Sequence, residues 1–193
     1  MAGADLAATS VRVAASVDRL FGHYLGDTGD GRDRLFAAMR HAGIGGGKRL
    51  RPLLTVATAR LFGLDEERAI RAGAAIEAIH VYSLIHDDLP CMDDDDLRRG
   101  KPTVHRLFDE ATAVLAGDCF HDLAYEILGD VATHEDPFVR AELVLALSRA
   151  TACTRLLSTC SRIRRRPRTR SCAVSWYSSL LALRGRAGWQ AVR

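Results

Sequence analysis

The chain has 193 residues, a formal net charge of +3 and a hydrophobic content of 48%. This length is sufficient for one domain with a sizeable core. No stretch approaches the roughly 18 consecutive apolar residues of a membrane-spanning helix. The first 20 residues include Asp5, Arg12 and Asp18, so a signal peptide is not expected. The five cysteines show no Cys-x-x-Cys spacing, and we therefore expect a cytoplasmic protein.

Charge is distributed unevenly along the chain. Residues 1–150 contain 17 Lys and Arg against 24 Asp and Glu, whereas residues 151–193 contain ten Arg and no acidic residue. No Asp or Glu follows Glu142, and no Lys follows Lys101. One domain seldom changes composition so abruptly. We therefore interpret residues 1–150 and 151–193 as two separate parts.

The start of the chain predicts three helices. Apolar residues recur at helical spacing from Leu6 to Tyr24, and the glycine-rich segment 26–31 predicts the end of this helix. A shorter amphipathic segment stops at Gly43. Pro52 suits the first position of a third helix, because its missing N–H has no helical partner there. Gly63 predicts the end of that helix.

The next segment predicts a longer helix that leads into an acidic cluster. Asp65 suits the N-cap of this helix, which must end before Pro90. Two further helices are expected over residues 111–128 and 138–150. No run of alternating apolar and polar residues predicts a sheet, so the predicted fold class is all-α.

Six aspartates lie within ten residues, and basic residues follow at once. Carboxylates this close repel one another by about 1 kcal/mol per pair in water, so cations are needed to hold them. Oxygen ligands favour a hard cation, Mg²⁺ first, and the adjacent basic side chains can hold a diphosphate. A solvated acidic loop is the alternative. The aspartates are Asp87, Asp88, Asp93, Asp94, Asp95 and Asp96, and the basic residues are Arg98, Arg99 and Lys101.

Sequence spacing indicates which residues near the acidic cluster lie on the same face of the helix. His80 and Asp87 are seven residues apart, so they lie within about 20° of each other around the helix. His80 alone would more often be a core histidine. Asp87 and Asp93 would be about 120° out of alignment on a straight helix. Pro90 breaks the helix between them and lets both acids face one metal ion.

A glycine-rich basic loop precedes the third helix. Its sequence, from residue 45 to 52, is Gly-Gly-Gly-Lys-Arg-Leu-Arg-Pro. The glycines let the backbone approach a ligand, and three cations ahead of a helix start suit an anion. A basic loop alone is more often simply solvated, and the spacing is not that of a Walker P-loop.

Together these motifs resemble the trans-isoprenyl diphosphate synthases, in particular the bacterial farnesyl and geranylgeranyl diphosphate synthases. The resemblance rests on residues 46–52, 79–93 and 96–103 and covers about residues 6–150. It implies the N-terminal portion of the isoprenoid synthase fold, in which antiparallel helices surround a deep apolar cavity. It also implies Mg²⁺ as cofactor and a homodimer where the fold is complete. No nucleic-acid partner and no transmembrane segment are expected.

The resemblance implies a role for each motif residue. Three aspartates match the first aspartate-rich motif, and the outer two would ligate Mg²⁺ bound to the allylic diphosphate. These three are Asp87, Asp88 and Asp93, of which Asp87 and Asp93 are the metal ligands. Arg98 would contact the same diphosphate, and the remaining acids would be solvated or second-layer residues. The residues that match the isopentenyl diphosphate pocket are Lys48, Arg51, His80 and Arg99.

The implied reaction condenses isopentenyl diphosphate with dimethylallyl or geranyl diphosphate to give a C15 or C20 isoprenyl diphosphate. Metal and arginine would stabilise the negative charge that develops on the departing diphosphate. Tyr82 lies five residues before Asp87, and two extra residues separate the acids of the motif. Both features favour the shorter, C15 product.

The resemblance stops near residue 150. Family members continue with a second aspartate-rich motif, which cannot be present because no acid follows Glu142. Three interpretations of residues 151–193 remain open: a basic arm for nucleic acid or membrane, a divergent helix, or an out-of-frame translation of a GC-rich gene. Arginine without lysine favours the third. The alternative function is therefore a truncated, non-catalytic product or subunit that at most binds Mg²⁺-diphosphate or pairs with a full-length partner.

Overall fold

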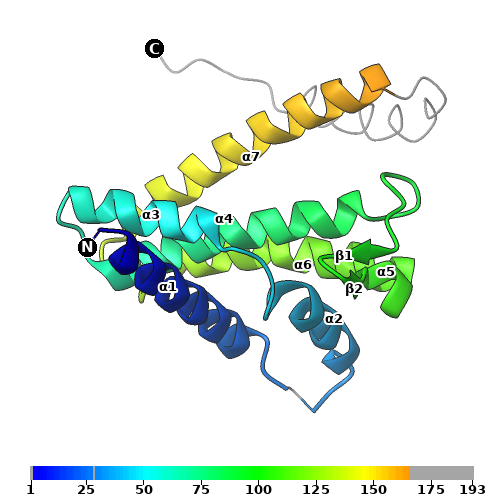
Figure 1. Ribbon diagram of the computed structural model, residues 1–193, viewed down its shortest axis with the longest axis horizontal. Helices are drawn as coiled ribbons and strands as arrows, with labels where there is room; N and C mark the ends of the chain where they lie inside the picture. Colours follow the sequence, from blue (N-terminus) through cyan, green and yellow to red (C-terminus); the bar gives the residue numbers. More distant parts are fainter. Residues whose placement is uncertain (1, 28, 166–193) are drawn as a thin grey trace. The chain divides into compact units, whose positions relative to one another are not determined.

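The computed structural model describes the backbone of residues 2–27 and 29–165. Over these residues it has seven α-helices and one two-stranded antiparallel hairpin (Figure 1), so the all-α prediction is confirmed. None of the described helices is long and apolar enough to cross a membrane. Packing divides the chain into two units, residues 1–148 and 149–193, and all predicted site residues belong to the first. Most of the predicted Arg-rich part lies outside the described residues.

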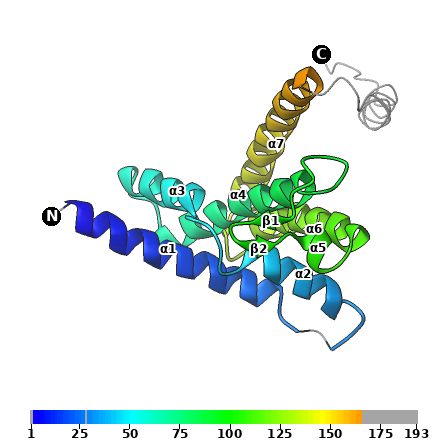
Figure 2. The same ribbon diagram turned by 45° about the vertical axis from the view of Figure 1, so that its right-hand side comes forward.

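The first two helices agree with the sequence prediction. Helix α1 spans Ala2–Tyr24 and α2 spans Asp33–Gly43. Val13 and Val17 of α1 are fully buried, as their helical spacing predicts. Phe21, which lies outside the predicted apolar face, is also buried, whereas Leu6 of that face is 58% exposed. The chain reverses direction between the two helices at the predicted glycine-rich segment (Figure 2).

Helices α3 (Leu50–Leu61) and α4 (Glu66–Asp87) carry the two motifs. Helix α3 begins two residues earlier than predicted, because the N–H of Leu53 bonds the carbonyl of Arg49 at 3.1 Å. Pro52 therefore lies within the first turn, where its missing N–H still has no helical partner. Asp65 caps α4 as predicted, since its side chain accepts the N–H of Arg68 at 2.9 Å.

A small hairpin follows the acidic cluster, which the sequence did not predict. Strands β1 (Leu97–Arg98) and β2 (Lys101–Pro102) pair antiparallel and lead into the short helix α5 (Val104–Leu107). Both turn residues have positive φ, 54° at Arg99 and 78° at Gly100. Two-residue strands are too short to produce an alternating pattern, and the turn geometry decides this element.

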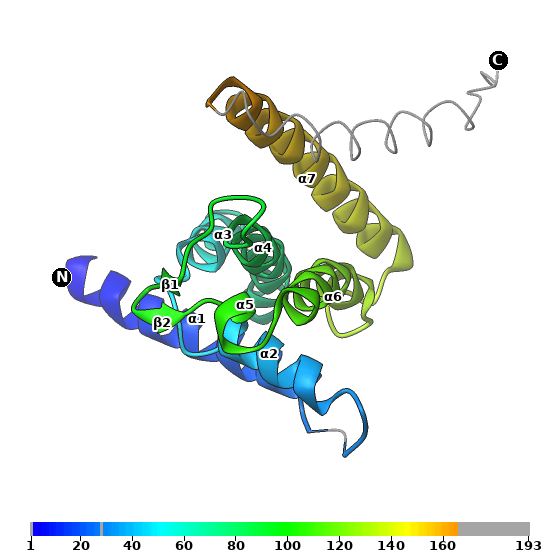
Figure 3. The ribbon, with the colours of Figure 1, turned by 90° about the vertical axis from the view of Figure 1, so that its right-hand side faces the viewer.

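Helices α6 (Glu110–Gly129) and α7 (Pro137–Arg165) follow. Helix α7 continues beyond residue 150, the last residue of the predicted helix and the point where the family resemblance stops. Helices α4 and α6 lie side by side and antiparallel, and Figure 3 shows them nearly end-on. The core includes an edge-to-face contact between Phe21 and Phe120, with ring centroids 5.7 Å apart.

Candidate diphosphate-binding site

The two predicted metal ligands lie together at the C-terminal end of α4. The helix ends at Asp87, and the loop that contains Pro90 turns the chain back. The N–H of Asp93 then donates to the carbonyl of Asp87 at 2.9 Å. This bond brings the backbones of the two acids together after the break at Pro90. Their role as metal ligands remains a prediction.

This donor set fits Mg²⁺ in its usual binding mode. Among the described residues, no group of three or more His, Cys, Asp or Glu side chains is arranged to hold a metal ion. Mg²⁺ commonly binds through only one or two carboxylates together with substrate phosphates. Asp87 and Asp93 provide such a pair, which would be completed by a diphosphate.

Asp88 and Arg98 form a half-buried ion pair behind the acid pair. The Nε of Arg98 lies 2.6 and 2.9 Å from the two Asp88 oxygens, and a terminal nitrogen also contacts Asp95 at 3.2 Å. Burial raises the pKa of Asp88, while Arg98 acts in the opposite direction. Asp88 therefore holds the guanidinium of Arg98 in place.

Two of the acids expected to be solvated have structural partners. Besides the contact of Asp95 with Arg98, Asp96 forms an ion pair with Arg106. The buried hydroxyl of Thr103 donates to the carbonyl of Asp95 at 2.9 Å. These bonds tie the acidic segment to the hairpin. The partners lie three residues away for Asp95 and Arg98 and seven to ten residues away for the contacts of Thr103 and Arg106.

The basic residues predicted for the second pocket lie near the contact between the hairpin and the glycine-rich loop. Lys48 and Arg51 are exposed on the loop and the first turn of α3. The guanidinium of Arg99 lies directly over Gly47, where an added Cβ would be 2.8 Å from its Cζ. Gly47 also has a φ of 86°. Glycine is required there both by the backbone conformation and by the close approach of Arg99.

His80 lies beside these cations, half-buried on α4. Burial lowers its pKa, and the positive charge of Arg51 lowers it further. Arg99 and Arg98 act in the same direction, whereas the charge of Glu77 opposes them. The structure therefore brings Arg51, His80 and Arg99 into one electropositive region, although they come from α3, α4 and the hairpin. Lys48 follows the glycine over which Arg99 lies.

Arg49 corrects the sequence interpretation of the loop. The sequence groups Arg49 with Lys48 and Arg51 as an anion-binding cation, but its side chain is buried and pairs with Asp18 and Glu77. Its φ of 46° turns it away from its neighbours. Sequence alone offers no signal for such a reversal.

Tyr82 lies in a row of rings between α4 and α6. Its ring centroid is 4.7 Å from that of His86 and 5.4 Å from that of His121, which in turn lies 5.0 Å from Tyr125. All these contacts are edge-to-face. The sequence identified Tyr82 as a position that influences product length, but it did not identify its partners on α6.

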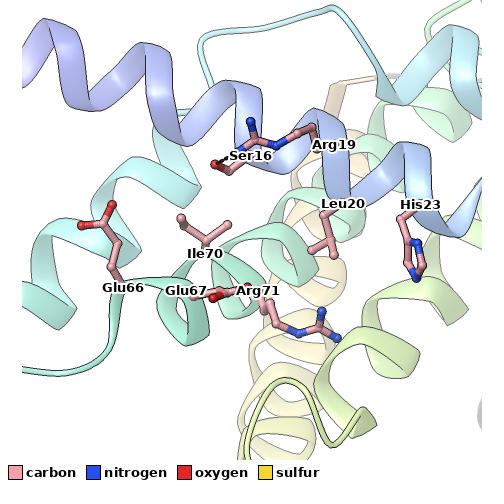
Figure 4. Close-up of a pocket in the computed structure, with 8 residues that line it drawn as sticks. All are labelled: Ser16, Arg19, Leu20, His23, Glu66, Glu67, Ile70 and Arg71. Atoms are coloured by element: carbon pink, nitrogen blue, oxygen red, sulfur yellow. Dashed lines mark hydrogen bonds between the residues drawn. The ribbon is translucent and has the colours of Figure 1, made fainter.

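A separate groove of about 560 Å³ lies between α1 and α4 (Figure 4). It contains none of the predicted site residues. Two charged residues of the groove, Glu66 and Arg71, form ion pairs with residues outside it. We therefore assign the groove no role. The groove is lined by Ser16, Arg19, Leu20, His23, Glu66, Glu67, Ile70 and Arg71.

Comparisons with known proteins agree with this geometry. The family model described as polyprenyl synthetase matches residues 32–159. The chain is similar to the farnesyl diphosphate synthases of Haemophilus influenzae, with 54% identity over 113 residues, and Bacillus subtilis, with 51% over 115. These matches cover 58% and 60% of this chain but only 37% and 38% of the relatives.

A solved structure shows the same arrangement of elements. The structure of an FPP/GFPP synthase from Zymomonas mobilis matches with a TM-score of 0.75 and 59% identity. That match covers 77% of this chain and 53% of the Zymomonas protein. The chain thus spans about half or less of the length of the proteins it matches. Since the family model covers well over half of the chain, this protein belongs to the polyprenyl synthetase family.

Proposed function

We propose that this chain carries the two diphosphate sites of an isoprenyl diphosphate synthase. The reaction would join isopentenyl diphosphate to an allylic diphosphate, dimethylallyl or geranyl, in the cytoplasm. One observation carries this proposal: the consecutive residues Arg98 and Arg99 connect the two sites. Arg98 pairs with Asp88 behind the acidic motif, whereas Arg99 lies over the loop that contains Lys48. The names of the relatives, farnesyl and geranylgeranyl diphosphate synthases, support the same substrate class.

The acidic site would receive the allylic diphosphate. Bound Mg²⁺, held by Asp87 and Asp93, would neutralise the charge that develops on the departing diphosphate. Arg98 would donate hydrogen bonds to the same group, and Asp88 orients its guanidinium for this task.

The basic site would hold the diphosphate of isopentenyl diphosphate, which does not leave. Lys48, Arg51 and Arg99 supply the positive charge, and His80 supplies a hydrogen-bond donor. Because its pKa is lowered, His80 is neutral near pH 7 in the unliganded chain. A bound diphosphate would favour its protonated form, so binding would take up a proton.

The row of rings that includes Tyr82 favours a short product. Bulky side chains one to two turns before Asp87 limit the space in which an allylic chain can extend. Tyr82 packs edge-to-face against His121 of α6, which also occupies this space. We therefore propose a C15 product.

The exposed apolar side chains favour a second candidate, a chain that binds diphosphate without turnover or acts by pairing with a complete partner. Leu54 and Leu115 are 66% and 54% exposed, and Ile76 is also exposed. Residues 143–193 contain no acid that could form a second metal site. One relative is named the large subunit of a heterodimeric geranylgeranyl pyrophosphate synthase from Arabidopsis thaliana. If the domain is complete, we propose that it pairs with a second copy of itself as a homodimer.

One assay separates the two candidates. The purified chain is incubated with Mg²⁺, radiolabelled isopentenyl diphosphate and either dimethylallyl or geranyl diphosphate. Formation of a C15 product establishes the synthase. Absence of product with retained Mg²⁺-dependent pyrophosphate binding, measured by calorimetry, establishes the binding chain. Absence of both contradicts the assignment of the two sites.

A further inference from the structure

A cluster of three charged residues lies beneath the Gly45–Lys48 loop. Arg49 is only 2% exposed, and it donates to Asp18 Oδ1 at 2.6 Å and to Glu77 Oε1 at 3.2 Å. Asp18 belongs to α1, Glu77 to α4, and Arg49 precedes α3. A guanidinium has five donors in a fixed plane, so it can join several acceptors at once. One side chain thereby connects three helices.

The same cluster fixes the backbone of the loop at both ends. Arg49 also donates to the carbonyl of Gly43, the last residue of α2. Asp18 accepts the N–H of Gly45 at 3.1 Å. The loop between these anchors has positive φ at Gly45 and Gly47, as does Arg49 itself. Positive φ is unfavourable for a non-glycine residue such as Arg49, so tertiary contacts must maintain this shape.

The cluster also reaches the helix that carries His80. Glu77 lies one turn before His80 on α4, so the two side chains occupy the same face. Glu77 is buried, and its second carboxylate oxygen has no hydrogen-bond partner. A charge buried in this way is stable only while Arg49 compensates it. The position of Arg49 is therefore tied to the helix face on which His80 lies.

We propose that Asp18, Arg49 and Glu77 are positioning residues that hold the loop of Lys48 beside His80. They do not contact the ligand themselves. Buried ion pairs contribute little net stability, because desolvation offsets their attraction, but they fix orientation. The identity of the ligand, a diphosphate, rests on the proposed function. The positioning of the loop rests only on the contacts above.

Proteolysis tests the positioning without any ligand. Lys48 and Lys101 are the two lysines of the chain, and Lys101 precedes Pro102. A lysine-specific endoprotease therefore has one readily cleaved site, which lies in this loop. The Asp18→Ala variant removes an acceptor of both Arg49 and Gly45. We expect cleavage after Lys48 in the full chain to become at least about tenfold faster, because cleavage follows the population of the opened loop.

The Asp130→Ala variant is the matched control. Asp130 accepts from Arg71 at 2.6 Å and from the N–H of Ala132 at 2.9 Å, much as Asp18 accepts from Arg49 and Gly45. The two carboxylates are 38% and 30% exposed. We expect the control to cleave within about twofold of the unmodified chain. Equal acceleration in both variants, or none in Asp18→Ala, would overturn the proposal.

Pyrophosphate binding provides a second measurement. Calorimetry with Mg²⁺-pyrophosphate should show an affinity at least about tenfold lower for Asp18→Ala and for the milder Glu77→Gln variant, and an unchanged affinity for Asp130→Ala. If the unmodified chain does not bind pyrophosphate, the proposed function fails, whereas proteolysis still decides the positioning. If it binds and Asp18→Ala binds equally well, the positioning proposal fails alone.

Discussion

The N–H of Asp93 donates a 2.9 Å hydrogen bond to the carbonyl of Asp87, six residues earlier in the chain. This bond closes the loop around Pro90 and replaces the helical ladder that the proline interrupts. It sets two carboxylate-bearing residues side by side at a helix end. The carboxylates of this acidic segment repel one another, and the hydrogen bond between Asp93 and Asp87 helps to hold its backbone in one conformation.

Removal of either of these acids should abolish metal-dependent catalysis. In a chimera completed with the second half of a relative, Asp87→Ala or Asp93→Ala should lower kcat at least about 100-fold, since each carboxylate contributes a few kcal/mol of charge stabilisation. Steady-state rates at saturating Mg²⁺ measure this. Asp94→Asn is the control, because Asn tolerates the positive φ of 56° at that position. An unchanged rate in both alanine variants would contradict the metal assignment.

Substitutions in the two predicted pockets should have different kinetic effects in the same chimera. Lys48→Ala and His80→Ala should chiefly raise the KM for isopentenyl diphosphate, because they contact a group that is unchanged in the reaction. Arg98→Ala should chiefly lower kcat and affect the allylic substrate. Separate titration of each substrate checks this. Equal effects of all three variants on both substrates would show that the division into two pockets is wrong.

The position of Arg99 should depend on Gly47. Gly47→Ala places a methyl group against the guanidinium and strains a backbone with a φ of 86°. We expect it to weaken pyrophosphate binding by about tenfold, or about 1.4 kcal/mol. Gly45→Ala imposes similar strain at a φ of 70° but has nothing within 4 Å of the new Cβ. Calorimetry on both variants separates backbone strain from displacement of Arg99, and equal losses would contradict a role for Arg99.

The lowered pKa of His80 should make folding depend on pH. The unfolded chain, with the ordinary pKa of 6.5, binds this proton more readily than the folded chain does. Stability from this group is therefore present above about pH 6.5 and is lost as the pH falls through the lower, folded-state pKa. Urea unfolding at about pH 5 and 7.5 should show a larger increase in the free energy of unfolding for the unmodified chain than for His80→Gln. An equal increase would indicate an unperturbed His80.

The exposed apolar side chains should weaken the cooperativity of unfolding. Each large side chain left in water loses roughly 1.5–3 kcal/mol of burial free energy. A few such losses, including those at Leu54 and Leu115, approach the roughly 5–15 kcal/mol stability of a whole domain. We expect a helical far-UV circular dichroism spectrum with a broad thermal transition. A sharp transition from a monomer, established by sedimentation, would contradict this expectation.

The sequence by itself determined the helices and the type of chemistry. Glycines and prolines end helices, and an aspartate such as Asp65 caps one, through contacts within a few residues. Apolar spacing placed Val13 and Val17 in the core for the same local reason. The carboxylates around Asp87 and the cations around Lys48 indicated a metal and an anion from residue type alone.

Only the tertiary structure decided which of these charges face a ligand. Arg49 turns inward to Asp18 and Glu77, partners 31 and 28 residues away. Arg99 crosses to Gly47, and Asp88 binds Arg98. Adjacent residues of one charge cannot be distinguished by local propensity. Their roles follow from how α1, α3, α4 and the hairpin pack, because that packing brings acceptors distant in sequence within hydrogen-bonding distance.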